Sequence, residues 1–600
     1  MIASEDLRAA ERVRNLVEQF EATAARHADR PCAKHKAGGR WIDTTWAEFA
    51  RRARNVSDGL AAMGVQRGDR VALLGETTLE WNVADLGAMG AAAISVPIYQ
   101  SLKPHDVAYI LENAGARFIF VDGENQAAKI REVKDRLPAL EGVIRFTGTP
   151  GAPWERTLAD VEQAGVEWRR GNEAAHAARL ASISLDDPAC FIYTSGTTGN
   201  PKGVILTHGN WVYEGDAVAQ IALLVEQELV LMFLPMAHSF AKVVQAAWLK
   251  LGFTMAFCES IEKLVDNAAE VRPTVLPAVP RIFEKAYNTV VAKGLATPGI
   301  KGRLFKWALE SLDTWALAKE RGETPPTSLG LLVGQKLVFP KLGATLAERF
   351  GGRVRFFVSG GAPLSPKIAW FFNAVGLTIL EGYGLTETAA GTCVNRPGKN
   401  AIGTVGLPVP GTQVRIAPDG EILLRGGGVM KGYYQAPQAT AEALVDGWFH
   451  TGDIGELDSE GRLRITDRKK DIIVTAGGKN VAPQNLENEL KASEPILSQV
   501  MVHGDKRKFL SALVTLNEDA ARKVAAGNGP LHEAPVVRAR VQAAIDRLNA
   551  QQASYSTIKK FAILPKDFTV DSGELTPTLK VKRKLCTQKY KDLLDSFYVD

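Results

Sequence analysis

The chain has 600 residues, of which 46% are hydrophobic and 23% are charged, and its formal net charge is +5. A chain of this length exceeds what one hydrophobic core usually serves, so two or more domains of ordinary globular composition are expected. The excess of 72 basic over 67 acidic residues is too small to argue for nucleic-acid binding, and we expect no nucleic-acid partner.

The cysteines and the apolar segments indicate in which cellular compartment the protein is expected. The five cysteines are widely scattered and form no CxxC pair: Cys32, Cys190, Cys258, Cys393 and Cys586. This pattern argues against a disulfide framework or a zinc site and favours a reducing compartment. Residues 1–33 lack the apolar segment of a signal peptide, and no stretch gives the roughly twenty apolar residues that cross a bilayer. We expect a cytoplasmic protein, with peripheral membrane contact left open.

Apolar, β-rich runs alternate with helical patterns from about Trp46 onward, for example at residues 70–74, 117–121 and 354–358. Strands that alternate with helices indicate parallel α/β layers. Residues 303–321 show an amphipathic pattern, which predicts a helix packed on the main body. A membrane-facing helix is the less favoured interpretation of the same pattern.

The pattern changes towards the C-terminus. Short strands separated by Gly-Pro turns over residues 403–465 predict a small β-barrel, and the charged run 467–471 follows as a candidate hinge, although such a run is usually a solvated surface. Helices at 481–490 and 536–551 and strands at 499–502 and 512–516 predict a further small domain. We therefore expect an α/β fold: a large N-terminal domain of layered α/β sheets plus the barrel (residues 1–467), and a smaller, mobile C-terminal α/β domain (residues 468–600).

Residues 193–204 carry the strongest chemical signal. Glycines and hydroxyl side chains alternate there with one basic residue; the candidate phosphate-binding residues are Thr194, Ser195, Gly196, Thr197, Thr198, Gly199 and Lys202. Glycines allow backbone N–H groups to approach an anion, and the hydroxyls and Lys202 add further donors, so the segment suits a polyphosphate. Pro201 excludes the Walker A pattern. The alternative is a plain Gly/Thr-rich turn between two strands.

This segment resembles the phosphate loop of the acyl-adenylate-forming synthetases, a superfamily of acyl-CoA synthetases, luciferases and peptide-synthetase adenylation domains. Other motifs of that superfamily follow in the same order over roughly residues 40–585. The resemblance implies ATP and Mg²⁺ as ligands, and CoA as co-substrate in the acyl-CoA synthetases.

The second motif covers residues 381–388. By resemblance Glu387 holds Mg²⁺, Thr386 contacts the α-phosphate, and Tyr383, next to Gly384, lies against the adenine. A carboxylate flanked by hydroxyls suits Mg²⁺, which takes few protein oxygens and completes its shell with phosphate oxygens and water. Taken alone, Glu387 would be read as a surface carboxylate.

Two further segments are implied to bind the nucleoside. Gly360, Gly361 and Ala362 follow a predicted strand, where they form either an adenine-contacting loop or a plain strand-to-helix turn. Asp453 follows a Thr-Gly turn, and the resemblance pairs it with Arg468 on the ribose hydroxyls. An ionised carboxylate is an acceptor matched to two hydroxyls.

The acyl substrate and the second reaction step involve other residues. His238, in a segment similar to the one beside the acyl carboxylate, is implied to position the substrate, although a lone His is more often structural. Long-chain synthetases often place an acidic-basic pair just after this His, whereas Ala241 and Lys242 stand here, which leaves the local contacts open. By resemblance, Lys470 occupies the hinge position, and Gly477 and Gly478 lie in the loop that faces CoA.

Lys580 is the implied catalytic lysine, with Glu387 and Lys202 as the other catalytic residues. The glycine that usually precedes this lysine is replaced by Leu579, as in many long-chain acyl-CoA synthetases. The implied reaction joins a carboxylate oxygen to the ATP α-phosphate, releases pyrophosphate, and then passes the acyl group to the CoA thiol.

Several local features resemble those of the long-chain acyl-CoA synthetases, notably residues 279–285, 467–471 and 575–583, and this resemblance implies a long-chain fatty acid as substrate. One alternative is an enzyme that stops at the adenylate or activates amino acids, but no aspartate stands between Met232 and Lys242 to meet an ammonium group. The other is a nucleotide- or lipid-binding pseudoenzyme, which the complete set of charged ligands disfavours. Chain-length preference and oligomeric state cannot be read from the sequence.

Overall fold

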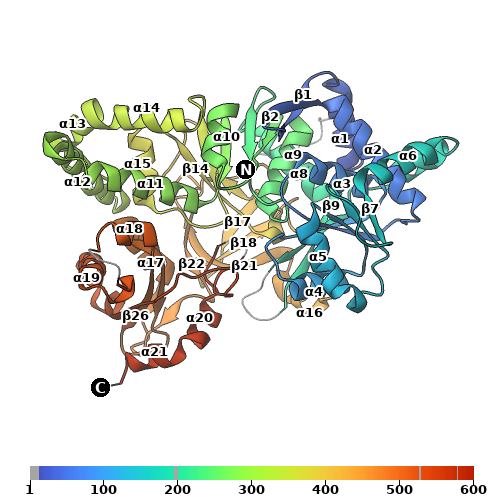
Figure 1. Ribbon diagram of the computed structural model, residues 1–600. Helices are drawn as coiled ribbons and strands as arrows, with labels where there is room; N and C mark the ends of the chain where they lie inside the picture. The colour runs from blue at the N-terminus through green and yellow to red at the C-terminus, as the bar shows by residue number, and fades with distance from the viewer. Residues whose placement is uncertain (1–12, 195–199, 526–528, 577–578, 600) are drawn as a thin grey trace.

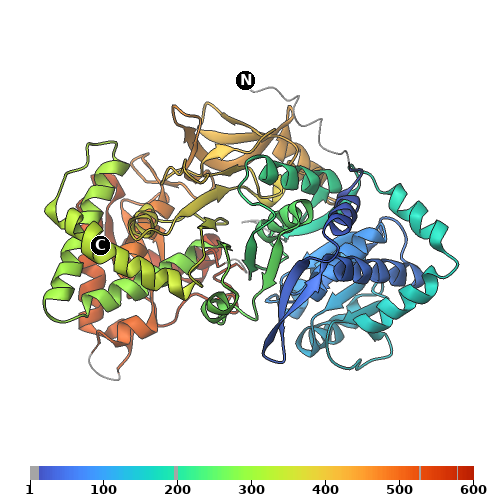
Figure 2. The same ribbon diagram turned by 90° about the horizontal axis from the view of Figure 1, so that it is seen from above.

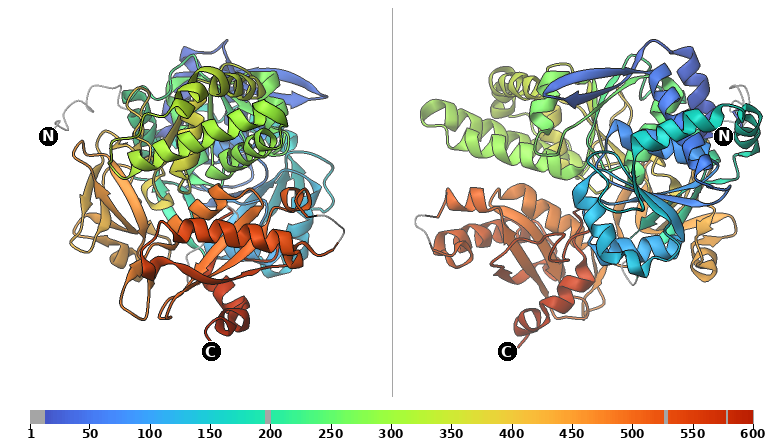
Figure 3. Two further views of the ribbon diagram at one scale, coloured as in Figure 1. Left: turned by 90° about the vertical axis from the view of Figure 1, so that its left-hand side faces the viewer. Right: turned by 45° about the vertical axis from the view of Figure 1, so that its right-hand side comes forward.

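The computed structural model describes residues 13–194, 200–525, 529–576 and 579–599 (Figure 1). A larger part is built around two mainly parallel sheets. A smaller C-terminal part lies beneath the lobe of helices α11 to α15, as two further views also show (Figure 3). Seen from above, that helical lobe and the N-terminal elements occupy opposite ends of the molecule (Figure 2). The phosphate-loop residues Ser195, Gly196, Thr197, Thr198 and Gly199 lie outside the described residues.

The first large sheet has a parallel centre with antiparallel strands at both edges. Its order is β16 (Leu407–Pro408), β15 (Cys393–Val394), β14 (Ile379–Tyr383), β13 (Phe356–Ser359), β12 (Val275–Ala278), β10 (Leu229–Met232), β11 (Thr254–Phe257), β1 (Pro31–Ala37) and β2 (Arg40–Thr45). The strand predicted at 354–358 therefore begins two residues later. The ends of β13 and β14 are the points from which the predicted nucleotide loops depart.

The second large sheet carries the strands around the phosphate loop. Its order is β19 (Gly432–Tyr433), β9 (Lys202–Thr207), β8 (Pro188–Thr194), β4 (Ile94–Ile98), β3 (Arg70–Leu74), β5 (Ala116–Val121), β6 (Gly142–Arg145) and β7 (Glu155–Thr157). β8 and β9 pair antiparallel, with Thr194 opposite Lys202.

Alternate strand residues separate the layers. In β3, Val71 and Leu73 belong to the core between the two sheets, whereas Ala72 and Leu74 belong to the core on the far side of their sheet. Successive side chains of a strand point to opposite faces, so both faces are covered. The shared core includes residues of α1 (Leu16–Arg26), α2 (Trp46–Ala62), α3 (Leu79–Gly90), α8 (His208–Gln220) and α9 (Ser239–Leu251); the far face of this sheet is covered by α4 (Pro104–Ala114) and α5 (Glu124–Val133).

The other face of the first sheet is covered by the helical lobe. It contains α10 (Leu264–Val271), α11 (Pro280–Leu295), α12 (Gly299–Glu320), α13 (Leu329–Val333), a π-helical turn η3 (Gly334–Val338), α14 (Phe339–Arg349) and α15 (Pro366–Ala374). The helix predicted at 303–321 is α12, and its Phe305, Leu309 and Leu312 are buried in this core. The predicted packing on the main body is therefore confirmed.

Residues 403–465 form short strands as predicted, but a closed barrel is not confirmed. The antiparallel sheet runs β17 (Gln413–Ile416), β18 (Glu421–Arg425), β21 (Trp448–Leu457) and β20 (Leu444–Val445), and β22 (Leu463–Arg468) also pairs with β21. Within the described ranges no pairing joins β17 to β20 or β22, so the sheet stays open. Among the described residues, the buried side chains of its small core are Cys393, Ile422, Leu424 and Leu463, with partly buried neighbours packed against them, and Cys393 comes from β15 of the first sheet. The sheet is thus covered by its neighbour instead of closing on itself.

The C-terminal part has the predicted mixed α/β character. Its elements are β23 (Ile473–Val474), β24 (Asn480–Val481), α17 (Pro483–Ser493), β25 (Leu497–His503), β26 (Leu510–Leu516), α18 (Glu518–Arg522), α19 (Pro535–Asn549), β27 (Ile558–Ile563), α20 (Arg583–Lys589) and α21 (Lys591–Ser596). Its core packs α17 and α19 on the sheet of β25, β26 and β27. The domain boundary at 467/468 stays a prediction. Across the described ranges, no helix has both the length and the apolar character needed to cross a bilayer.

A buried ion pair joins two helices of the shared core. Lys242 of α9 and Asp85 of α3 are both almost completely buried, and Nζ lies 2.7 Å from Oδ2. Gln245 donates to the same oxygen at 3.0 Å and Ser95 to the other at 2.7 Å. Lys242 therefore lies in the core, paired with Asp85. This settles its role, which the absence of the usual acidic-basic pair after His238 had left open.

Replacing Lys242 by Met should destabilise the protein strongly, because Asp85 would remain buried without its cation. Removing one partner of such a pair costs roughly 3–5 kcal/mol. We expect a clear fall in the thermal unfolding midpoint by circular dichroism. Lys306→Met is the matched control, since its 3.8 Å pair with Glu310 is exposed and contributes at most about 1 kcal/mol. Equal midpoints for the two variants would contradict this role.

Candidate active site

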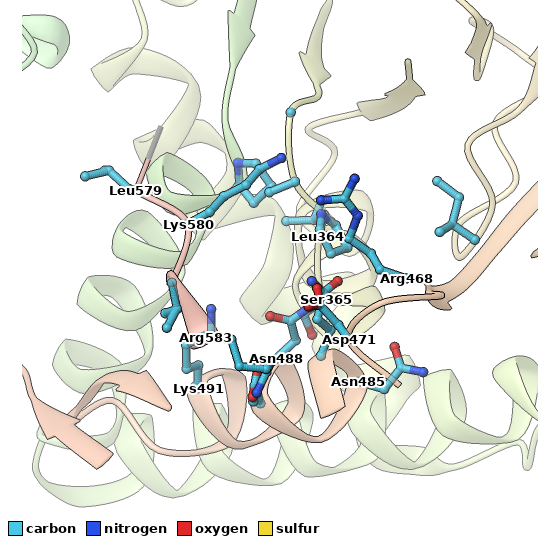
Figure 4. Close-up of a pocket in the computed structure, with 18 of the residues that line it drawn as sticks. Leu364, Ser365, Arg468, Asp471, Asn485, Asn488, Lys491, Leu579, Lys580 and Arg583 are labelled. Atoms are coloured by element: carbon cyan, nitrogen blue, oxygen red, sulfur yellow. Dashed lines mark hydrogen bonds and ion pairs between the residues drawn. The ribbon is translucent and has the colours of Figure 1, made fainter. Parts of the chain in front are cut away.

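A cleft of about 3380 Å³ lies between the large part and the C-terminal part. In the close-up, Lys580 and Arg468 enter it from opposite sides (Figure 4). The sequence-predicted residues that line it are Thr194, Lys202, His238, Gly361, Ala362, Tyr383, Gly384, Thr386, Glu387, Asp453, Arg468, Lys470 and Lys580. Segments far apart in the chain thus converge on one space.

Three predicted residues do not line this cleft. Gly360 lies just behind it, where a Cβ would come within 3.3 Å of the Phe240 ring. Gly477 and Gly478 lie in the exposed connection between β23 and β24, with open space around Gly478. In the arrangement seen here, the predicted CoA-facing loop is therefore turned away from the other site residues.

Asp453 joins two elements of the cleft. Tyr383 Oη, at the end of β14, donates to Oδ2 at 2.7 Å, and Arg468 Nε donates to Oδ1 at 2.8 Å. Asp453 on β21 faces Arg468 on β22 in the strand register, and only 5% of Asp453 is exposed. A carboxylate offers about four acceptor sites, so each oxygen keeps a position for one further donor such as a ribose hydroxyl.

Glu387 sits on the short 3-10 helix η4 (Thr386–Thr388) and accepts a 2.9 Å hydrogen bond from Tyr433 Oη. Burial raises the pKa of Glu387, and the Tyr433 hydroxyl opposes that rise. Lys202 Nζ lies 5.2 Å from the centre of the Tyr433 ring, within cation–π range. Tyr433, which sequence reasoning missed, therefore connects the predicted metal ligand with the phosphate-loop lysine.

His238 is the N-cap of α9, and its Nδ1 accepts a hydrogen bond from the Phe240 N–H at 3.0 Å. Burial lowers the pKa of His238 to about 4, and the nearby Lys580 ammonium lowers it further. The ring is therefore neutral at pH 7, and because Nδ1 is the acceptor, Nε2 carries the proton. His238 can donate one hydrogen bond to a substrate but is poorly suited to act as a proton acceptor.

Two glycines of the predicted loops are required by the backbone. Gly361 has φ +82°, in the left-handed region that favours glycine, and a Cβ there would lie 3.7 Å from the His238 ring. At Gly384 a Cβ would lie 1.8 Å from the Ala390 carbonyl oxygen, so no other residue fits. The glycines thus allow close approach of backbone segments around the cleft.

Lys580 extends into the cleft from the C-terminal part. The side chain is exposed to the cleft, and partial desolvation by the surrounding protein lowers the pKa of Lys580 to about 8; Arg468 also lowers it, whereas Asp453 and Glu387 raise it. Its neighbour Leu579 has φ +61°, a left-handed conformation that is costly for a leucine. That backbone conformation explains why glycine is the usual residue before this lysine.

Two buried carboxyl groups near the motif at 381–388 were not predicted as site residues. Burial raises the pKa of Glu381 to about 8. Glu214 on α8 is 1% exposed, burial raises its pKa, and among the described residues neither of its carboxyl oxygens has a hydrogen-bond partner. It lies against Gly391 and Gly428. In the sequence, Glu214 could have been noticed only as a glutamate on the apolar side of a helix.

The comparisons agree with this architecture. A family model described as AMP-binding enzyme matches residues 20–434, and one described as AMP-binding enzyme C-terminal domain matches residues 470–600. The chain belongs to the AMP-binding enzyme family.

Similar proteins span nearly its whole length. It is 42% identical to the long-chain-fatty-acid–CoA ligase FadD15 of Mycobacterium bovis, over 93% of both chains. It is 32% identical to the long-chain-fatty-acid–CoA ligase ACSBG2 of Xenopus laevis, over 97% of this chain and 83% of that one.

Solved structures share the fold. The adenylation domain of a carboxylic acid reductase from Segniliparus rugosus, in complex with AMP and a carboxylic acid, has a TM-score of 0.73 at 20% identity, covering 99% of this chain and 95% of that one. O-succinylbenzoate CoA synthetase from Bacillus subtilis, in complex with AMP, has a TM-score of 0.67 at 19% identity, covering 95% and 98%.

Proposed function

We propose that the protein is an AMP-forming long-chain fatty-acid–CoA ligase. It converts a fatty acid and ATP to an acyl-adenylate and pyrophosphate, and then transfers the acyl group to CoA with release of AMP. The convergence of Lys580, Glu387 and the Asp453–Arg468 pair on one cleft carries this proposal. The relatives named as long-chain fatty-acid–CoA ligases support the choice of substrate.

The nucleoside part of ATP is proposed to lie along the open sheet and the end of β14. The free acceptor positions of Asp453 take the ribose hydroxyls, and Arg468 holds the carboxylate in place. The adenine lies between Tyr383 and the loop Gly360–Gly361–Ala362. The phosphates extend towards Thr386, Lys202 and the residues 194–199.

Glu387 fits as the protein ligand of Mg²⁺. Its second oxygen, Oε2, is left for the ion, since Tyr433 occupies Oε1. Within the described residues no group of three His, Cys, Asp or Glu side chains is placed to hold a metal. A single carboxylate suits Mg²⁺, which takes its remaining ligands from phosphates and water. When bound, the ion neutralises charge on the phosphate chain.

The adenylation step depends on electrostatics. An oxygen of the fatty carboxylate attacks the α-phosphorus, the bond to the β-phosphate oxygen breaks, and pyrophosphate leaves with its electrons. Lys580 and Lys202 supply fixed positive charge where negative charge develops. His238, which is neutral, donates Nε2–H towards the reacting carboxylate or phosphate.

The second step is proposed to need a rotation of the C-terminal domain, predicted as residues 468–600, about Lys470, in which Arg468 and Lys469 stay bound to the large part. The rotation withdraws Lys580 and brings Gly477 and Gly478 to the cleft. Polar contacts across the interface include Arg281, which donates to Ser498 O at 3.1 Å and to its Oγ at 3.0 Å, Lys103, which donates to Asp571 O at 2.9 Å, and the 3.7 Å ion pair of Lys491 with Glu284; Ala492 adds an apolar contact with the helical lobe. Such polar contacts can be exchanged for water at low cost.

We further propose a cytoplasmic location with peripheral membrane contact and no nucleic-acid partner. The use of ATP and CoA, together with five cysteines that are all free thiols, supports the cytoplasmic location. Fatty acids partition into membranes, which supports peripheral membrane contact.

Lys580→Ala should abolish adenylation while sparing thioester formation. We expect fatty-acid-dependent pyrophosphate–ATP exchange to fall at least about 100-fold, the effect typical of losing one preorganised charge in a transition state. Acyl-CoA formation from supplied acyl-adenylate should stay within a few-fold of wild type. Lys584→Ala, an exposed lysine on the same segment, is the control.

Equal loss of both half-reactions in the Lys580 variant would refute the assigned role. Pyrophosphate exchange that is intact in the wild type, without CoA-dependent release of AMP, would instead identify an enzyme that stops at the adenylate.

The adenylation half-reaction should weaken as pH rises through about 8. The pKa of Lys580 is lowered to about 8, so the required ammonium is present below that pH and lost above it. kcat/KM for ATP reports the free enzyme and should show this descending limb. Lys580→Arg should move the limb beyond the measured range, and the thioester step should lack it. A limb that persists unchanged in the Arg variant would belong to another group.

A further inference from the structure

The outer surface of the helical lobe carries large apolar side chains that face solvent. The exposed fractions are 75% for Ile300 and 42% for Trp307 on α12, 67% for Leu329 and 45% for Leu332 on α13, and 55% for Leu337 on η3. We refer to these five residues as the lobe patch. In Figure 1, α12 and α13 form the left-hand edge of the molecule, with the C-terminal part lying below them.

The lobe patch is continuous across two helices. Ile300 and Trp307 are seven residues apart, so they lie on one stripe of α12. A Cβ on Gly330 would lie 2.8 Å from the Trp307 ring and 2.1 Å from Ser311 Oγ, so the start of α13 packs against that stripe. Leu329 and Leu332, three residues apart, therefore extend the apolar surface beside Trp307.

The surroundings of the lobe patch are cationic. Residues 294–309 contain Lys301, Arg303 and Lys306, and residues 324–347 contain Lys336 and Lys341, with no acidic residue inside either stretch; Glu310, Glu323 and Glu348 stand directly beside them. All five basic side chains are exposed. Within the part of the chain that the structure describes, only Lys306 has an acidic partner, the 3.8 Å pair with Glu310. Exposed leucines and a tryptophan flanked by lysine and arginine are typical of a surface that binds anionic lipid.

A second copy of the chain suits this surface less well. A symmetric contact would bring the same cations of two subunits together, and like charges in apposition are unfavourable. An anionic bilayer offers phosphates for the cations and an apolar layer for the leucines. The same helix α12 also lines the active-site cleft, through Leu309, Ala316 and Leu317 on other faces. Docking here would bring that cleft wall close to the membrane in which fatty acids dissolve.

We propose that the lobe patch and its surrounding cations form the surface by which the enzyme docks on an anionic bilayer. The leucines, Ile300 and Trp307 enter the headgroup region, and the basic side chains contact the lipid phosphates. This names the surface for the membrane contact proposed above. Its test uses no turnover, so failure of the docking surface and failure of the ligase activity can be told apart.

The test is co-sedimentation of the full chain with vesicles, in the absence of substrates. The wild type should bind phosphatidylcholine–phosphatidylglycerol vesicles, more weakly as salt rises, and phosphatidylcholine vesicles much less. Leu329→Glu with Leu332→Glu, and separately Lys301→Glu with Lys336→Glu, should each weaken binding about tenfold or more. Val536→Glu on α19 (43% exposed) and Lys559→Glu are the matched controls and should bind as the wild type does.

Retention of wild-type circular dichroism would show that the variants fold. Wild-type protein that stays in the supernatant, or lobe variants that bind as tightly as the controls, would overturn the proposal. It would also be overturned if the lobe substitutions changed the sedimentation of the protein alone from dimer to monomer, because the surface would then be a contact between copies.

Discussion

The site depends on the buried carboxylate of Asp453. It accepts hydrogen bonds from Tyr383, at the end of β14, and from Arg468, on the last strand before the C-terminal part. These bonds fix the end of the large part, where the chain passes into the C-terminal part. Arg468 also precedes Lys469, whose N–H donates to the Gly452 carbonyl at 2.8 Å. Any rotation of the C-terminal part must therefore begin after this anchored pair. The predicted hinge at Lys470 is the next residue.

This anchor also fixes the electrostatics of the cleft. Arg468 stands close enough to Lys580 to lower its pKa, and Glu387 and Asp453 act in the opposite direction. Without nucleotide, two cations thus face each other across the interface between the two parts. A bound polyphosphate would lie between them and turn that repulsion into attraction. ATP would in this way favour the arrangement in which Lys580 faces the cleft, and loss of pyrophosphate would weaken it.

Several motifs of the candidate site could be identified from the sequence. The phosphate loop could be recognised from its own glycines, hydroxyls and lysine, whereas Glu387, Asp453 with Arg468, and Lys580 were recognisable only through the resemblance to the acyl-adenylate-forming synthetases. The short strands predicted within residues 403–465 are confirmed, for example at Gln413–Ile416 and Glu421–Arg425, since their alternation and turns are local. The roles of these residues remain proposals, but their convergence on one cleft is a structural observation.

Features that depend on distant partners could not be read in this way. Tyr433 reaches Glu387 only because β19 pairs with β9, and Lys242 is a core residue only because Asp85 lies opposite on another helix. The predicted barrel is not confirmed, because strand alternation gives no information on how the edges of a sheet pair. Likewise, the amphipathic pattern of α12 correctly predicted core packing, yet the second apolar stripe of that helix could be recognised only once α13 was placed beside it.

The central claim is that the cleft brings a fatty carboxylate to the α-phosphorus of ATP. The most direct measurement uses a long-chain fatty acid whose carboxyl group carries heavy oxygen, incubated with the wild-type protein, Mg²⁺, ATP and CoA. Mass spectrometry of the nucleotide product should find one heavy oxygen on the phosphate of AMP. Heavy oxygen in inorganic phosphate with ADP as the nucleotide product, or unlabelled AMP, would contradict the claim.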